Sequence, residues 1–142
     1  MDNCELTRYL TLDVLLNSES DLTDLVSSLE MQGIFIVYNG RSEAGGFYAV
    51  LEPPIDMDAD SPEAQAVQFA KLVEGLAPNI HQSWSGCKSR IFDFGFESGF
   101  QPARLEHNLS KEALENILTV GAEIRISIYQ ANPAPKPSSG TR

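Results

Sequence analysis

Residues 6–16 read LTRYLTLDVLL, and the alternation of apolar and polar side chains in this stretch decides which kind of fold the chain can adopt. Successive side chains of an extended strand point to opposite faces of a sheet. The residues that share one face are Leu6, Leu10, Leu12, Val14 and Leu16, with Arg8 interrupting that face near its start. This period of two predicts a half-buried strand that contributes one face to a core.

A helix and a hairpin are predicted next along the chain. Apolar residues recur at helical spacing after Ser20, which we expect to be the N-cap, and Gly33 fits the residue that closes the helix. The apolar stripe consists of Leu22, Leu25, Val26 and Leu29. Residues 33–40 read GIFIVYNG, with apolar side chains on both faces, which predicts a central strand. Residues 46–52 read GFYAVLE and predict the second strand of a hairpin.

The second half of the chain has a similar pattern. Ser61 and Pro62 predict the start of a second helix. Residues 90–97 read RIFDFGFE and predict a strand whose aromatic face fits core packing better than the lining of a ligand cavity. Residues 77–90 fit a helix, a loop or a short strand.

The last two elements have clear boundaries in the sequence. Ser110 predicts the N-cap of a third helix, and Gly121 predicts its closing residue. After this glycine, the alternation of isoleucines predicts a final strand with one inward face. The residues of that face are Ile124, Ile126 and Ile128.

These elements predict an α+β fold. We expect a twisted mixed sheet of about five strands with three helices, in a ferredoxin-like sandwich or a related βαβ-repeat arrangement. The repeat is indicated by the order strand, helix, glycine, strand, which occurs in residues 6–38 and again in residues 90–129. We expect residues 1–130 to form a single domain and residues 131–142, which are rich in proline and serine, to form a disordered tail.

The composition disfavours several classes of partner. The chain of 142 residues has 20 acidic and 10 basic side chains, and its net charge is -10. This charge repels phosphate backbones and anionic lipid, so we expect no nucleic-acid or membrane binding. No leader sequence and no apolar run of ~18 residues is present, which predicts a cytoplasmic protein. Cys4 and Cys87 lack the spacing of a metal site and are expected to be free thiols.

Residues 53–63 read PPIDMDADSPE and contain the densest group of acids. With Asp56 as the first position of a calcium loop, Asp58 and Asp60 occupy the third and fifth positions. However, Ser61 stands where such a loop needs glycine, and Val67 stands where it needs a bidentate glutamate. We therefore expect no metal and no cofactor, and the stretch is either a docking surface or a solvated connection.

Catalytic patterns are weak in this sequence. His81 and His107 are far apart, without the spacing of a metal site or a catalytic pair. Neighbouring acids such as Asp93 and Glu97 are expected by chance in so acidic a chain. Trp84 stands in a polar stretch, HQSWSGCKS, which fits an exposed anchor for a partner or a cap over a helix end.

Residues 89–130 read SRIFDFGFESGFQPARLEHNLSKEALENILTVGAEIRISIYQ. This segment resembles the C-terminal half of the bacterial domain-of-unknown-function family numbered four-two-seven-nine. The shared features are an apolar strand, a loop with Gly and Pro, a helix opened by Leu109–Leu114, a glycine, and a strand that ends in Ile128-Tyr129. The resemblance implies a small acidic immunity protein, which neutralises a toxin from the same locus, and it supplies no catalytic residues.

The expected function is therefore that of a non-catalytic immunity protein, and we do not expect an enzyme. Its partner would be a cognate toxin that is basic around its active site, steered by the negative charge. The expected partner-binding residues are Glu43, Glu52, Asp56, Asp58, Asp60, Glu63 and Trp84. Two alternatives stay open, a small-molecule-binding or minor enzymatic domain that uses the concave sheet face, and an acidic nucleic-acid mimic. The oligomeric state is also open.

Overall fold

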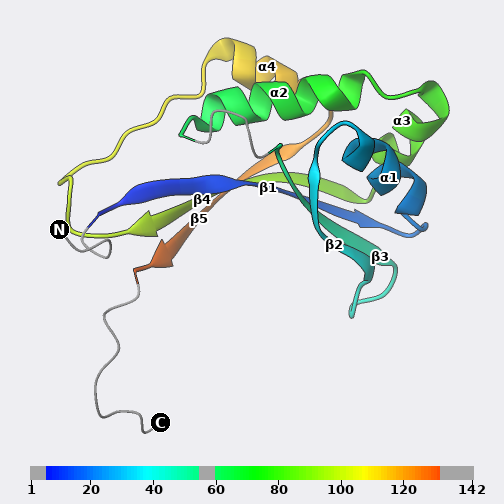
Figure 1. The fold of residues 1–142 in the computed structure, drawn as a ribbon, viewed down its shortest axis with the longest axis horizontal. Helices are drawn as coiled ribbons and strands as arrows, with labels where there is room; N and C mark the ends of the chain where they lie inside the picture. The colour runs from blue at the N-terminus through cyan, green and yellow to red at the C-terminus, as the bar shows by residue number, and fades with distance from the viewer. Residues whose placement is uncertain (1–5, 55–59, 132–142) are drawn as a thin grey trace, which may run out of the picture.

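A computed structural model describes residues 6–54 and 60–131 of the chain. The elements, shown in Figure 1, are β1 (Arg8–Ser18), α1 (Thr23–Met31), β2 (Phe35–Arg41), β3 (Phe47–Glu52), α2 (Pro62–Glu74), α3 (Pro78–Ser85), β4 (Ser89–Ser98), α4 (Lys111–Thr119) and β5 (Glu123–Gln130). Cys4, Asp56, Asp58 and the predicted tail from residue 132 onward lie outside the described residues.

The strands of residues 6–54 and 60–131 form one five-stranded sheet in the order β2-β3-β1-β4-β5. Neighbouring strands are antiparallel except β4 and β5, which are parallel. The predicted α+β class and mixed sheet are thus confirmed, and the strand order is roughly compatible with a ferredoxin-like arrangement. The two predicted repeats differ, because β3 lies between β1 and β2 whereas β4 and β5 are direct neighbours.

The helices cover one face of the sheet, as Figure 1 shows. Leu12, Val14 and Leu16 of β1 are fully buried beneath them, as the alternation in residues 6–16 predicts. Phe92 of β4 packs edge-on against Phe69 of α2, with ring centroids 5.7 Å apart. The aromatic face of β4 therefore belongs to the core. No helix within the described residues is long and apolar enough to cross a membrane.

Most of the predicted helix ends are confirmed. The hydroxyl of Ser61 accepts from the backbone N–H of Ala64, and that of Ser110 accepts from the N–H of Ala113. Gly33 and Gly121 have φ angles of +98° and +71°, the left-handed conformation that L-residues with a side chain avoid. The predicted Ser20 cap is wrong, because α1 starts at Thr23, where the carboxylate of Asp21 accepts from the backbone N–H of Thr23.

Several predictions about the position of elements are wrong. The described residues contain four helices where three were expected, because residues 78–85, which fit a helix, a loop or a short strand in the sequence, form α3. The strand in residues 33–40 was expected at the centre of the sheet, but β2 is an edge strand. Its apolar side chains do not require a central position, since Phe35 and Val37 are exposed. Ile124, Ile126 and Ile128 lie on the helix side of the sheet as predicted, since they pair with Phe92, Phe94 and Phe96, but they are exposed on the opposite edge strand, β5.

Trp84 is not an exposed anchor. It lies in α3 with only 1% of its surface exposed, and its indole N–H donates to the carbonyl of Val120 at 2.7 Å. Helical spacing turns this side chain inward although its sequence neighbours are polar. The prediction that Trp84 binds a partner is therefore wrong, and the residue joins α3 to the turn before β5.

Candidate functional site

The face of the sheet opposite the helices carries an acidic row, which we define as Glu52, Asp13 and Asp93. These residues alternate with core residues of β3, β1 and β4, so their side chains point away from the helices. Asp13 pairs directly with Asp93 across the antiparallel strands. Glu52 follows Leu51, the partner of Val14, and so stands on the other side of Asp13.

The two central carboxylates of this row, Asp13 and Asp93, lack hydrogen-bond donors for part of their oxygen atoms within the described residues. Asp93 is only 7% exposed, although it stands on a face without a helix among the described residues. One carboxylate oxygen of Asp93 and one of Asp13 are buried without a hydrogen-bond donor within the described part of the chain. A buried carboxylate without partners is energetically costly. The row therefore favours a proton or a cationic group.

The protonation of Asp13 responds to this environment. Burial raises the pKa of the Asp13 carboxyl to about 7, and a hydrogen bond with Glu52 and the negative charges of Glu52 and Asp93 act in the same direction. The proton on Asp13 reduces the repulsion within the row near neutral pH. As the pH rises through about 7, Asp13 loses this proton, and the acidic row gains one negative charge.

We expect Asp13→Asn to flatten the pH dependence of stability. The folded pKa is raised, so stabilisation by the bound proton is complete below the unfolded pKa of about 3.8 and is lost as pH rises through about 7. Between pH 5 and pH 8, the free energy of unfolding of the parent should fall by about 1 to 2 kcal/mol more than that of the variant. This range is smaller than the full pKa shift implies, because solvent partly screens the half-buried carboxyl. Urea denaturation at both pH values measures this difference, with Glu74→Gln as an exposed control. Equal pH dependence of parent and Asp13→Asn would contradict the role of Asp13.

Aromatic and basic residues surround the acidic row. The ring of Tyr129 lies over Gly95, where an added Cβ would be 3.5 Å from the ring. Arg125 pairs with Asp93 across β4 and β5, yet these residues form no ion pair within the described residues. At the hairpin end of the sheet, a hollow of about 560 Å³ is lined by residues that include Tyr38, Tyr48, Arg41 and Glu43.

The structure separates the predicted partner-binding residues into two groups. Glu52 belongs to the acidic row, and Glu43 lines the hollow at the hairpin end. Asp60 and Glu63 instead lie at the start of α2, on the helix side of the sheet. Glu63 is already engaged, because its carboxylate accepts from the backbone N–H of Ser110 at 2.7 Å.

Sequence reasoning missed Asp13 as a functional residue and considered Asp93 only as a partner of Glu97. The available signal was that Asp13 and Asp93 each interrupt an apolar strand. Their proximity depends on the register between β1 and β4, which the sequence pattern of neither strand specifies.

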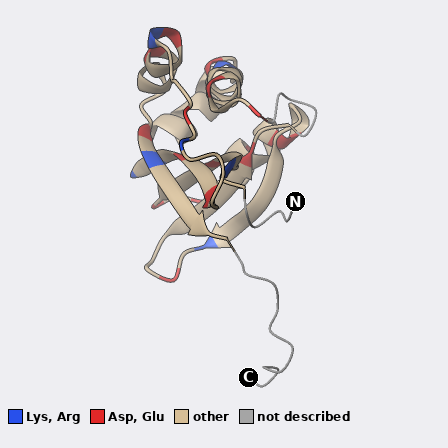
Figure 2. Ribbon diagram, turned by 90° about the vertical axis from the view of Figure 1, so that its left-hand side faces the viewer, with Lys and Arg blue, Asp and Glu red and all other residues tan. Residues whose placement is uncertain are grey.

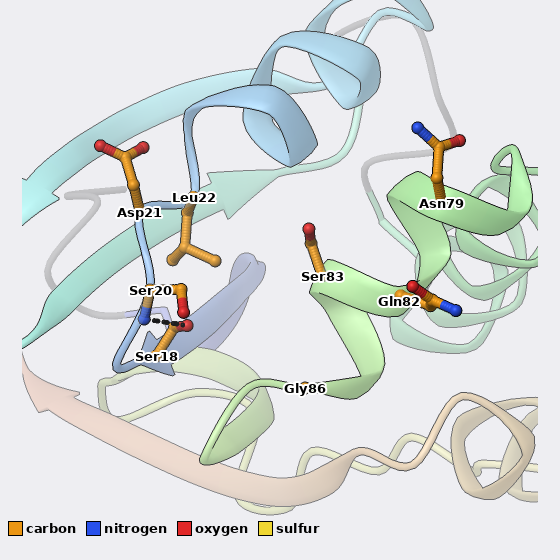
Figure 3. A pocket seen from close by; sticks show the side chains of 8 residues that line it. All are labelled: Ser18, Ser20, Asp21, Leu22, Asn79, Gln82, Ser83 and Gly86. Atoms are coloured by element: carbon orange, nitrogen blue, oxygen red, sulfur yellow. Dashed lines mark hydrogen bonds between the residues drawn. The ribbon is translucent and has the colours of Figure 1, made fainter.

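A second hollow lies between α3 and the connection from β1 to α1. Figure 3 shows polar side chains from both segments around it, including Ser18, Ser83 and Asn79. The hydroxyl of Ser18 accepts from the backbone N–H of Ser20 at 3.0 Å. The volume is about 250 Å³, which is below the usual ~300 to 1,000 Å³ of small-molecule sites. Within the described residues, no group of three His, Cys, Asp or Glu side chains could hold a metal ion.

Comparisons with protein-family models, with curated proteins and with solved structures found no match to this chain.

Proposed function

We propose that this protein is a non-catalytic immunity protein, which binds and neutralises a basic toxin by holding a cationic side chain of the toxin against the acidic row. The observation that carries the proposal is the pair of buried carboxylate oxygens on Asp13 and Asp93, which have no donor within the described residues. They belong to strands whose face opposite the helices is left uncovered by the described helices.

An arginine of the partner fits this row best. A guanidinium group offers five N–H donors in a planar fork, which matches carboxylate oxygens on adjacent strands. Its charge offsets the repulsion between Asp13, Asp93 and Glu52 without a need for protonation. Arg125 lies at the β5 end of the row and repels another cation. The partner's cation therefore enters more favourably at the Glu52 end.

The rest of the molecule supports association with a basic protein. The net charge of -10 attracts such a partner over distances of about 8 to 10 Å at moderate salt. Around the row, Phe35, Tyr38 and Tyr129 are exposed aromatic residues, a residue class that supplies much of the contact energy at protein interfaces. This combination of a charged centre and an aromatic margin favours a protein partner.

Co-expression with the product of the adjacent gene tests the proposal. The parent should restore growth, whereas the double variant Asp13→Asn, Asp93→Asn should bind at least about 30-fold more weakly, since breaking a buried charge pair at an interface costs about 2 kcal/mol or more. The control Glu30→Gln, Glu74→Gln removes two carboxyl groups from exposed positions on α1 and α2 and should retain binding.

Calorimetry adds a second readout. Affinity of the parent should increase as the pH rises from 6 to 8, because Asp13 loses its proton over this range. Equal weakening by both double variants would reduce the effect to net charge and contradict a role for the row. Failure of the parent to bind the adjacent gene product would contradict the immunity function.

One observation favours a second candidate, a minor enzymatic or small-molecule-binding domain. Neighbouring carboxyl groups such as Asp13 and Asp93, with the pKa of Asp13 raised to about 7 by burial, resemble acid–base pairs of enzymes. However, the hollows described above are not lined by either carboxyl group. A soaked or co-purified small molecule in contact with Asp13 would favour this candidate over the toxin inhibitor.

A further inference from the structure

The outer edge of β5 is an unprotected strand edge within the described residues. Its side chains Ile124, Ile126 and Ile128 point to the helix side of the sheet, yet 42%, 56% and 69% of their surfaces are exposed. The strand contains no proline, and its register with β4 is regular from end to end. Natural sheets usually protect such edges with proline, lysine or a bulge, because an open apolar edge pairs with other strands.

Helix α4 carries two further exposed apolar side chains on the helix side of the sheet. Leu114 and Leu118 stand one turn apart on α4 and are 44% and 76% exposed. The helix leads into β5 through the turn at Gly121, and Figure 2 shows α4 and β5 along the same margin of the molecule. A hollow of about 360 Å³, lined in part by Phe96, Ile126 and Ile128, continues this surface beside the strand.

We propose that a second copy of this chain covers the edge, with the two β5 strands antiparallel about a two-fold axis at Ile126. The pairing forms one continuous sheet of ten strands, five from each copy. A two-fold interface uses the same surface on both copies, so the exposed apolar side chains of β5 and α4 meet their own equivalents.

The sequence of β5 is self-complementary in this register. Ile126 faces Ile126, Ile124 faces Ile128, Arg125 faces Ser127, and Glu123 faces Tyr129. No like charges are opposed, and the three isoleucines of each copy form one apolar row. A two-fold axis at Arg125 would instead set two guanidinium groups opposite each other, which destabilises a sheet. Charge thus selects the axis at Ile126 over the axis at Arg125.

The other edge of the sheet is less suited to such pairing. The register between β2 and β3 shifts between Ile36 and Tyr38, which marks an irregularity in the edge strand. Irregularities of this kind twist an edge and oppose pairing with another sheet. The two edges therefore favour one closed dimer through β5 rather than an open chain of β5-to-β2 contacts.

Sedimentation equilibrium of the full chain tests the dimer. The parent should have twice the monomer mass of 15.6 kDa. Ile126→Lys should raise the dimer dissociation constant at least about tenfold, because it places two ammonium groups opposite each other at the two-fold axis. Because each copy has a net charge of -10, higher salt should strengthen association of the parent. Val37→Lys places the same charge at an exposed site on β2 and should leave the dimer intact, and thermal melting verifies that each variant is folded.

Cysteine cross-linking tests the register. In a Cys4→Ser background, Ile126→Cys should form a disulfide-linked dimer, because the two residues face each other across the axis. Ile124→Cys should not, because its counterpart is Ile128. A parent that is monomeric at all concentrations, or that forms open assemblies larger than a dimer, would overturn the proposal. A dimer that is lost in Val37→Lys but kept in Ile126→Lys would show that the contact is made by β2 instead. A dimer that appears only after deletion of residues 132–142 would show that these residues, and not a second copy, cover the edge of β5 in the full chain.

Discussion

Replacement of Trp84 by alanine is expected to lower the free energy of unfolding by about 3 to 5 kcal/mol. The side chain is almost completely buried, and its ring lies 6.4 Å from that of Phe69 between centroids. Its indole N–H is also the donor for the carbonyl of Val120. Alanine would leave a large cavity between α3 and α2 and a carbonyl without its donor, and both effects destabilise the fold.

Urea denaturation of matched variants measures this effect. Trp84→Phe keeps most of the apolar volume but removes the N–H donor, so we expect a smaller loss of about 1 to 3 kcal/mol. Tyr129→Ala removes an exposed aromatic ring and should cost less than Trp84→Ala. A loss below about 1 kcal/mol for Trp84→Ala would contradict the buried position of the indole.

Replacement of Arg90 by methionine is expected to lower the free energy of unfolding by about 2 to 3 kcal/mol. The guanidinium of Arg90 donates to the carbonyls of Trp84, Ser85 and Cys87 through Nη1, at 2.8 to 3.1 Å, and to the carbonyl of Gly121 through Nε, at 2.9 Å. Carbonyls at the end of a helix lack intrahelical donors and carry partial negative charge. Arg90 satisfies this end of α3 and the turn before β5 together.

The geometry of Arg90 separates the effect of charge from that of hydrogen bonding. Arg90→Lys keeps the positive charge near the end of α3 but loses the planar fork, so it should recover only part of the lost stability. Arg104→Met is the control, because Arg104 is an exposed arginine whose ion pair with Glu106 lies at the surface. If denaturation showed Arg90→Met to be as stable as Arg104→Met, the four carbonyl contacts would not contribute to folding.

Trp84 and Arg90 together explain how the C-terminal part of the chain is positioned. Trp84 contacts Val120, and Arg90 contacts Gly121, the residue that closes α4 with a left-handed conformation. These two contacts fix the turn from which β5 begins. They therefore set the position of the strand edge that we assign to the dimer.

Local features of the fold could be predicted from the sequence because their causes lie within a few residues. Alternation in residues 6–16 indicates the buried face of β1, and the buried Leu12, Val14 and Leu16 confirm it. Ser61 and Ser110 cap helices through a backbone N–H three residues away. Gly33 and Gly121 mark positions where a side chain would be strained. None of these features depends on distant parts of the chain.

The candidate site depends on tertiary structure because its residues come together through strand pairing. Asp13 and Asp93 are 80 positions apart and become neighbours only through the register of β1 with β4. Glu52 joins them from β3, while Asp60 and Glu63, which are close to Glu52 in sequence, lie on the other side of the sheet. Proximity along the chain was therefore a poor guide to the acidic surface.

Periodicity in the sequence was enough to predict a final strand with one isoleucine face, Ile124, Ile126 and Ile128, and it placed a tryptophan, Trp84, among polar neighbours. The exposure of the isoleucines and the burial of the tryptophan became known from the packing of the folded chain. The physical reason is that alternation and helical periodicity divide an element into two faces, whereas burial of a face depends on which other elements pack against it. Within the described residues, the strand order leaves one edge of β5 without a neighbouring strand, and the indole of α3 is buried in the core.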